Sequence, residues 1–428
     1  MSSALDKYDF FDPKIVQWPY DLYRVMRREA PVCKVVEKAT GHEIYMITPY
    51  DLVQHVFRTP EIYSNRHAAI LLAGGSENPE ADAVLKQGWP EMDTFDSDPP
   101  GHTRYRSLAN KAFSPKAVMQ MTDFIGDIVD DLIDEFIERG ECDFMKEFAV
   151  PLPIYAIMGI LGVGREYKDS FQEWSDAFGI MMSHMNTPAE EVEAAWRIVA
   201  FQKFAREVID ARRSKPGDDI ISALIHAKGD NNEPQLNDNE LLSMIRQFML
   251  AGSETTRNTT TAGLGLLLRH PDQLARLFAD PSLLSDALDE VLRYHSPVCG
   301  IWRIIRKDVE LAGTHMSAGA LAMIRIDSAN HDETQFENPD VFDIGRANLR
   351  NHVAFGQGIH FCIGAMLARR EMLEAFSRTL SRMKKLAIVE ETSDLSNYPG
   401  LILRAPRALH VRFDPGPRRR PAARVRLI

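Results

Sequence analysis

Apolar residues recur at every third or fourth position over long parts of the chain, which predicts amphipathic helices. The clearest stripe runs from Met121 to Ile137, where aspartates fall mostly between the apolar positions. Further helices are predicted from Pro19 to Arg28 and from about Lys168 to Met182. The run Thr187-Pro188-Ala189-Glu190 has the residues of a helix N-terminus with a capping box. The stripe from Met121 to Ile137 is core scaffold, whereas the methionines at 181, 182 and 185 could fill gaps in the core or line an adaptable pocket.

The longest helix is predicted from Asn237, with Glu240 as its capping partner, to about Arg269, where Pro271 stops it. At 1.5 Å per residue it would be roughly 45–50 Å long. Its middle reads Ala251-Gly252-Ser253-Glu254-Thr255-Thr256. Glycine and threonine are poor helix formers, so we expect a turn that is widened beside a ligand.

Alternating apolar and polar positions predict short strands. Residues 33–48 alternate around Gly41 as a hairpin would, and further strands are expected within 301–326 and from Leu409 to Phe413. The periodicity is lost between His67 and Pro100, which predicts a long loop. Such a loop within a compact domain is more often functional than idle.

Composition narrows the class of protein. Of 428 residues, 45% are hydrophobic and 26% are charged, as in a soluble globular protein. The net charge of −11 argues against a nucleic-acid partner. Residues 1–14 contain no apolar segment that would serve as a signal peptide, and no stretch of about eighteen uncharged apolar residues follows for a membrane anchor. We therefore expect a cytoplasmic protein, which the scattered cysteines also favour.

The strongest chemical signal is the stretch Phe355-Gly356-Gln357-Gly358-Ile359-His360-Phe361-Cys362-Ile363-Gly364. Its glycines permit a tight loop, and a cysteine just before a helix is favoured as a thiolate by backbone N–H groups and the helix dipole. The zinc pattern of several close ligands and the CxxC redox pattern are both missing. A lone thiolate suits haem iron, which takes four ligands from its porphyrin. The alternative is a structural cysteine buried after a glycine turn.

This stretch resembles the haem-binding loop of the cytochrome P450 family, with each fixed position filled. Four blocks agree with the family in identity and order, over residues 15–414. The resemblance implies one mainly α domain with a small β-rich lobe, in which haem b lies between the long central helix and the cysteine loop. We expect this domain to cover residues 1–414. Residues 415–428 have five arginines and no acid, and are expected to form a disordered tail.

The resemblance assigns roles to particular residues. Cys362 would be the ligand of the haem iron. Other cofactor-binding residues would be Ala251, Gly252, Phe355, Gly356 and Gly364, with His102, Arg106, Arg303 and His360 as partners of the propionates. Arg306 could substitute for Arg303. Glu290, Arg293 and Arg346 match the structural triad that braces the haem side of the core. By themselves, a His and an Arg four apart, or a Glu-x-x-Arg, would be common solvated pairs.

Glu254 and Thr255 match the acid–alcohol pair of the family, with Glu in place of the also common Asp. The Thr255 hydroxyl would hydrogen-bond dioxygen, and Glu254 would relay protons through water. Alternatively, both merely cap local backbone groups. The expected reaction inserts one atom of O₂ into a hydrophobic steroid, terpenoid, fatty acid or aromatic compound. The rivals are an H₂O₂-driven peroxygenase, whose members often lack this pair, and a haem sensor or ligand-binding protein.

The substrate pocket expected from the family is apolar, which predicts orientation by shape. Its residues would be Leu71, Met182, Phe248, Ala251, Val298, Ile301 and Leu401, all of which could equally be core. The chain has no flavin or iron–sulfur motif, so electrons would come from NAD(P)H through a ferredoxin reductase and a ferredoxin. Residues 363–385 carry six basic and two acidic side chains, a net charge of +4. We expect this helix to dock an acidic ferredoxin, or otherwise to be a solvated face.

Overall fold

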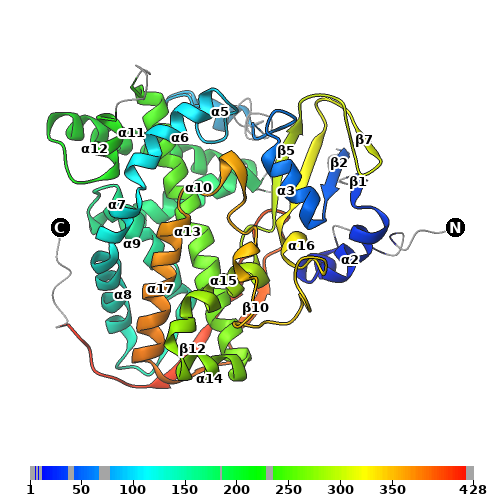
Figure 1. Cartoon of the computed structure of the whole chain (residues 1–428). Coiled ribbons are helices and arrows are strands. Elements are labelled where there is room, and N and C mark those ends of the chain that lie inside the picture. Colours follow the sequence, from blue (N-terminus) through cyan, green and yellow to red (C-terminus); the bar gives the residue numbers. More distant parts are fainter. Residues whose placement is uncertain are drawn as a thin grey trace. The chain divides into compact units, whose positions relative to one another are not determined.

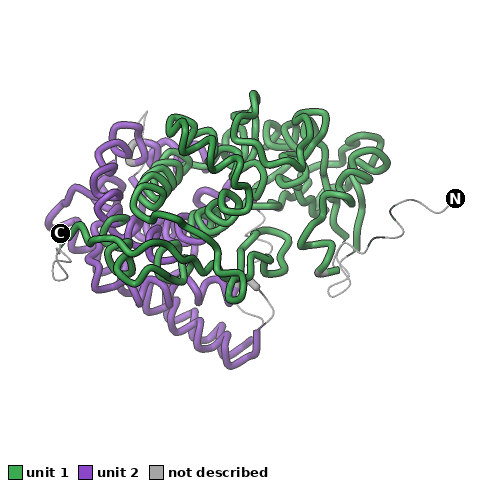
Figure 2. The backbone as a smooth tube through the Cα atoms, turned by 90° about the horizontal axis from the view of Figure 1, so that it is seen from below, with its two compact units in different colours: residues 1–65, 129–149, 255–420 green, residues 66–128, 150–254, 421–428 purple. Residues whose placement is uncertain are grey.

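The computed structural model describes residues 5, 8, 12–36, 43–66, 78–183, 186–227 and 235–420 (Figure 1). The chain divides into two units, coloured green and purple in Figure 2. Unit 1 comprises residues 1–65, 129–149 and 255–420, and unit 2 comprises residues 66–128, 150–254 and 421–428.

The described residues of unit 2 form helices joined by loops, with no strand among them. Its longest helix, α11 (Pro188–Ser214), packs against α5 (Pro79–Leu85), α10 (Lys168–Ser183) and α12 (Ile220–Ile225). The capping box expected at Thr187 is confirmed. The remaining elements of this unit are α6 (Gly101–Ala112), α7 (Pro115–Gln120), α9 (Pro151–Ile160) and the 3₁₀ turn η3 (Arg165–Tyr167).

Helix α5 corrects the expectation of a continuous loop between His67 and Pro100. It begins with Asn78 as its N-cap and Pro79 in its first turn. Only Ala81 and Val84 are buried in this helix, so it is too short and too polar to show helical periodicity in the sequence.

Two helices carry residues of both units, α8 (Thr122–Phe136) and α13 (Asp238–Arg269). The 32 residues of α13 span about 48 Å. Its predicted cap is confirmed, because the N–H of Glu240 donates to Oδ1 of Asn237 at 3.0 Å and the N–H of Asn237 donates to Oε2 of Glu240 at 2.8 Å.

The widened turn expected in the middle of α13 is wrong, because the helix is α-helical throughout. Its hydroxyl residues are accommodated by donating back to carbonyl oxygens four residues earlier. Ser253 donates to Met249 at 2.7 Å, and Thr259 donates to Thr255 at 2.7 Å. Each bond satisfies a side chain that would otherwise compete with the helix.

Unit 1 contains a five-stranded sheet in the order β1-β2-β8-β5-β3, in which only β2 and β8 are parallel. Its strands are β1 (Val32–Val36), β2 (Glu43–Ile47), β3 (Tyr63–Ser64), β5 (Gly300–Ile305) and β8 (Leu321–Arg325). Strands β1 and β2 form the predicted hairpin. The helices α2 (Tyr20–Glu29), α3 (Tyr50–Arg58) and α16 (Ile326–Asn330) supply side chains to the core beside this sheet.

Three smaller sheets complete unit 1. They are β6 (Val309–Leu311) with β7 (Thr314–Met316), β10 (Asp394–Asn397) with β11 (Pro406–Ala408), and β4 (Glu141–Asp143) with β12 (His410–Asp414) and β9 (Lys384–Ile388). The other helical elements of this unit are α1 (Pro13–Gln17), η2 (Met145–Ala149), α14 (Pro271–Ala279), η5 (Pro281–Leu283), α15 (Leu284–His295), η6 (Leu349–Asn351), η7 (Gly358–His360) and α17 (Ala365–Arg382).

Helix α17 ends before the basic residues Lys384 and Lys385, which begin strand β9. The predicted helix over 363–385 is therefore too long. The chain leaves the helix because β9 pairs with β12 through backbone hydrogen bonds.

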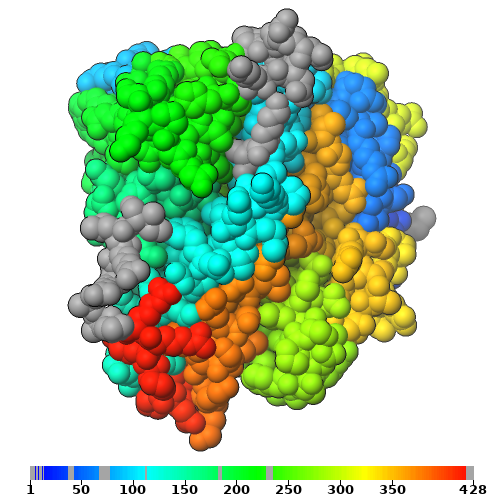
Figure 3. Space-filling view, turned by 60° about the vertical axis from the view of Figure 1, so that its left-hand side comes forward, coloured from blue at the N-terminus to red at the C-terminus, as the bar shows by residue number. Residues whose placement is uncertain are grey.

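The first residues of the expected tail are held against unit 1. The N–H of Gly416 donates to the carbonyl oxygen of Ile137 at 3.0 Å, and the N–H of Arg419 donates to Oδ1 of Asp134 at 3.0 Å. In Figure 3 the red end of the described chain lies against orange atoms. Residues 421–428 lie outside the described part of the chain. Among the described helices, none is both long enough and apolar enough to cross a membrane.

Candidate functional site

Left-handed glycines shape the loop that carries Cys362. Gly356 has a φ of +68° and Gly358 a φ of +70°, which L side chains rarely adopt. A Cβ atom on Gly358 would also lie 2.4 Å from the carbonyl oxygen of Phe57. The N–H of Cys362 donates to the carbonyl oxygen of Phe355 at 2.9 Å and closes the loop. The sequence therefore requires glycine where the chain turns toward the cysteine.

The thiol of Cys362 is placed to bind a ligand. None of the four cysteines forms a disulfide, and Cys362 is the exposed one. The N–H of Ala365, the first residue of α17, donates to the carbonyl oxygen of Cys362 at 3.3 Å. A Cβ atom on Gly364 would lie 3.9 Å from the Cys362 sulfur, an ordinary contact. An accessible thiol at a helix N-terminus fits the axial ligand of a haem iron.

Phe57 of α3 connects this loop with Arg303 of β5. Its ring lies 3.7 Å from the position that a Cβ on Gly356 would take, and Cζ of Arg303 lies 5.6 Å from the ring centroid. Arg303 is 2% exposed and donates to the carbonyl oxygen of Trp302 at 2.7 Å. A buried guanidinium near the thiolate loop is the group that a haem carboxylate would need. The possible substitute, Arg306, is exposed.

The predicted triad comes together at α15. Arg293 donates to both carboxylate oxygens of Glu290, at 2.6 and 2.8 Å, and both residues are fully buried. Nε of Arg346 lies 3.5 Å from Oε2 of Glu290. Arg293 also donates to the carbonyl oxygen of Pro339 at 2.9 Å, and Arg346 to that of Val341 at 2.8 Å. The triad thus fastens the loop after α16 to α15.

A second buried group, which the sequence did not reveal, supports the start of the cysteine loop. Arg369 of α17 donates to Oδ1 of Asp289 at 2.9 Å, and Nε2 of His352 lies 3.4 Å from the same oxygen. Burial raises the pKa of Asp289, but His352 and Arg369 together lower it below its usual value. Cζ of Arg369 lies 4.6 Å from the ring centroid of Phe355. In the sequence, this group was indicated only by the short distance along the chain between Arg369 and the cysteine loop.

Unit 2 contains His102 and Arg106, one turn apart on α6. His102 is 2% exposed, and burial together with the Arg106 charge lowers its pKa to about 4. Arg104, on the same helix, pairs with Glu240 at 2.7 Å, and the Tyr105 hydroxyl donates to the same carboxylate at 2.8 Å. Glu240 therefore both caps α13 and anchors α6, a second role that sequence reasoning missed.

The middle of α13 presents the expected small residues and the acid–alcohol pair. Ala251 is exposed, and Gly252, Glu254 and Thr255 are half-buried. A Cβ atom on Gly252 would make an ordinary 3.6 Å contact with Ile157. The described protein atoms would therefore leave room for a Cβ atom at this position, and they do not explain why it is glycine.

Three of the expected pocket residues, Val298, Ile301 and Leu401, lie in unit 1. Val298 forms a β-bridge with Leu403, and the N–H of Cys299 donates to the carbonyl oxygen of Ile402 at 2.8 Å. Val298 and Ile301 pack on one hydrophobic cluster of unit 1 and Leu401 packs on another, and all three residues are half-buried.

The other predicted pocket residues belong to unit 2 or are not described. Phe248 is 6% exposed in unit 2 and packs on Phe95 and Phe113, with centroids 5.5 and 5.0 Å away. Leu71 and the side chain of Met182 lie outside the described residues.

The basic residues of α17 are largely occupied by internal ion pairs. Arg378 pairs with Glu374 at 3.1 Å, and Arg382 pairs with Asp130 at 2.9 Å. Arg369 is bound to Asp289, as described above. The net charge of the helix alone therefore overstates the free positive charge of this face.

Together these features define a class of protein in which a cysteine thiolate binds haem iron. No group of three or more His, Cys, Asp or Glu residues forms a metal site within the described ranges. The family model for cytochrome P450 matches residues 36–412, and the chain belongs to this family. It is a cytochrome P450 monooxygenase, and haem b is the cofactor of the family.

Curated relatives and solved structures agree with this assignment. The steroid C26-monooxygenase of Mycobacterium tuberculosis is 36% identical over 92% of this chain and 94% of the relative. The monooxygenase PikC of Streptomyces venezuelae is 35% identical over 93% of this chain and 92% of the relative. The structure of CYP109E1 from Bacillus megaterium in complex with testosterone has a TM-score of 0.78 and 30% identity, over 92% of this chain and 99% of that chain.

Proposed function

We propose that this monooxygenase inserts one oxygen atom from O₂ into a steroid or a hydrophobic molecule of similar size. The observation that carries the proposal is the β-bridge between Val298 and Leu403, which places two half-buried apolar residues side by side in unit 1. An apolar surface with few polar groups selects a ligand by shape. Two proteins named above, the steroid C26-monooxygenase and the testosterone complex, support the steroid class.

The residues of unit 1 would hold the cofactor as follows. Cys362 would hold the haem iron through its sulfur, and the N–H groups that follow it would stabilise the thiolate. Arg303 and His360 bind the haem carboxylates, because a buried carboxylate needs charged or hydrogen-bonding partners. When bound, haem b supplies the activation of O₂. For His102 and Arg106 of unit 2, the support is their match to the family motif and the burial of His102.

Proton delivery is the proposed task of Glu254 and Thr255. The carboxylate of Glu254 takes up protons from solvent, and the Thr255 hydroxyl passes them on to the oxygen that leaves as water. Ala251 and Gly252, one turn earlier on α13, keep that face of the helix small.

An optical titration of the haem-loaded protein tests the substrate class. Steroids, macrolactones, fatty acids and substituted aromatics are added in turn, and the shift of the haem band toward high spin is recorded. We expect steroids to give the largest shift. The variant Val298→Ala should raise the steroid dissociation constant roughly tenfold, because one apolar contact is lost. Val309→Ala, in the β6–β7 hairpin, is the matched control. A shift with another class alone would reject the steroid assignment.

The electron donor is proposed to be an acidic ferredoxin that docks beside the cysteine loop. Arg58 and Arg350 are exposed there, and Nη2 of Arg58 lies 3.1 Å from Oε1 of Gln357 in the loop. Ile359 and Phe361 are exposed apolar residues of the same loop. Reduction by ferredoxin should slow as salt rises, and Arg58→Gln should reduce that salt dependence whereas Arg412→Gln should not. Reduction that is insensitive to salt would contradict this docking.

A further inference from the structure

Unit 1 buries two arginines beside one carboxylate. Arg325 is the last residue of β8, Arg404 precedes β11, and Asp327 lies in α16. Arg325 is 3% exposed, Arg404 is 6% exposed and Asp327 is fully buried. A guanidinium is not deprotonated in proteins, so these three side chains carry a net charge of +1 away from water. Such a charge is costly unless it has a counter-ion.

The carboxylate of Asp327 is committed to Arg325. Nε and Nη2 of Arg325 donate to its two oxygens at 3.2 and 2.9 Å. The hydroxyl of Tyr23 and the N–H of Ser328 donate to the same group at 3.2 and 2.9 Å. Nη2 of Arg404 stands 3.9 Å from Oδ2 of Asp327, beyond hydrogen-bond range.

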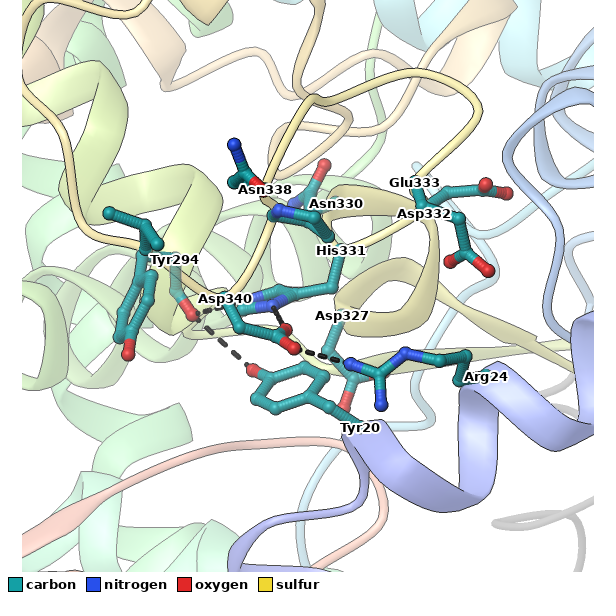
Figure 4. A network of polar contacts seen from close by, with 12 residues as sticks. Tyr20, Arg24, Tyr294, Asp327, Asn330, His331, Asp332, Glu333, Asn338 and Asp340 are labelled. Carbon is teal, nitrogen blue, oxygen red and sulfur yellow. Dashed lines mark hydrogen bonds and ion pairs between the residues drawn. The ribbon is translucent and has the colours of Figure 1, made fainter.

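Instead of a carboxylate, Arg404 has an uncharged hydrogen-bond partner. Its Nη1 donates to the hydroxyl of Tyr20 at 2.6 Å, and its Cζ lies 5.0 Å from the centroid of that ring. Its buried Nη2 makes no hydrogen bond to any described residue. Figure 4 shows Tyr20 and Asp327 beside a separate pair, in which Asp340 accepts from Arg24 and contacts His331. That neighbouring acid is thus already engaged.

A cavity of about 20 Å³ adjoins these arginines. Its lining includes Arg325, Arg404, Tyr23, Met46, Leu22 and Cys299. This volume holds one particle of the size of a water molecule. Burial raises the pKa of the Tyr20 hydroxyl and of the Cys299 thiol, so neither residue supplies the missing negative charge.

We propose that this cavity binds a monatomic anion, chloride in solution, between the guanidinium groups of Arg325 and Arg404. The anion balances the excess charge and accepts a hydrogen bond from Nη2 of Arg404. Because the site joins the segment before β11 to β8 and α2, anion binding stabilises the fold of unit 1.

Unfolding of the haem-loaded protein tests the site. Sodium chloride is compared with sodium gluconate at equal ionic strength, because gluconate is too large for the cavity. Chloride should stabilise the protein in a saturable way, and a concentration ten times the dissociation constant should shift the folding equilibrium about elevenfold. The variant Arg404→Met should lose this difference between the salts, whereas Arg407→Met, which changes a more exposed arginine of β11, should keep it.

Bromide provides a test that needs no variant. Crystals of the wild-type protein grown with sodium bromide should show anomalous scattering between Arg325 and Arg404. Density without an anomalous signal would identify the occupant as water and overturn the proposal. Equal stabilisation by chloride and gluconate would overturn it as well.

Discussion

The hydroxyl of Thr255 is the single group on which the proposed proton delivery depends most. Removing it in Thr255→Ala should leave haem binding intact but uncouple NAD(P)H consumption from product, with peroxide released instead. Product formed per NAD(P)H should fall about tenfold or more, since positioned proton transfer contributes at least that much. Thr255→Ser, which restores the hydroxyl, should recover most of the coupling. Tight coupling in the alanine variant would remove Thr255 from this role.

His295, at the end of α15, makes the stability of the protein depend on pH. It is buried, and its Nε2 has no hydrogen-bond partner among the residues described. Burial, with the charge of Arg404, lowers its pKa from 6.5 to about 3. The unfolded chain therefore binds a proton more readily than the folded one. The stability that neutral His295 provides is complete above pH 6.5 and is lost as the pH falls toward 3.

When the pH falls from 7 to 5, protonation of His295 in the unfolded chain should lower the unfolding free energy of the wild-type protein by about 2 kcal/mol. The variant His295→Gln cannot titrate, so its loss over that interval should be smaller by about the same amount. His315→Gln, which removes an exposed histidine, is the control. The measurement is urea unfolding at each pH. Identical pH dependence of wild type and His295→Gln would show that burial does not hold this group neutral.

Candidate residues that lie within a short stretch could be recognised in the sequence, whereas residues that meet across the chain could not. Cys362 and its glycines lie in ten consecutive positions, and Glu290 and Arg293 are three apart. Arg404 and Tyr20 are separated by 384 positions, and nothing local in either stretch indicates the other. Long-range partners of this kind are set by folding rather than by sequence pattern.

Among the elements, α15 and the loop after α16 are joined by the triad of Glu290, Arg293 and Arg346. Replacing the acid in Glu290→Gln leaves two guanidinium groups near one another without their carboxylate. Breaking a buried pair in this way costs about 3–5 kcal/mol, which urea unfolding of the haem-loaded protein would measure. Glu310→Gln, at an exposed position of β6, should change stability by less than about 0.5 kcal/mol. A similarly small loss for Glu290→Gln would show that the triad does not brace this region.

Helix α17 shows why the charge of an element is a poor guide to its surface. Its own residues suggested a strongly positive face, but Asp130 and Asp134 of α8 neutralise Arg378 and Arg382. The same aspartates also hold Arg419 and the backbone of Arg420. The sequence displayed both charge runs, and only the fold shows that they pair with each other.

Over the whole chain, the resemblance carried by a few motifs predicted the mainly α fold and its small β-rich part, and both are confirmed. Most long helices were predictable because their caps and apolar stripes are local. The short strands β4, β9, β10 and β11 were not, because three to five residues that pair with distant partners leave no periodic signal. The roles of the site residues stay predictions, since each depends on groups that only the loaded enzyme brings together.

The central claim is that Cys362 binds the haem iron as a thiolate. The most direct test is the absorption spectrum of the haem-loaded protein after reduction and addition of carbon monoxide. Thiolate ligation shifts the main band to longer wavelength than histidine ligation does, so wild type should show the shifted band and Cys362→His should lose it. Cys299→Ser, which changes a buried cysteine, should keep the shifted band. An unshifted band in folded wild-type protein would contradict the account.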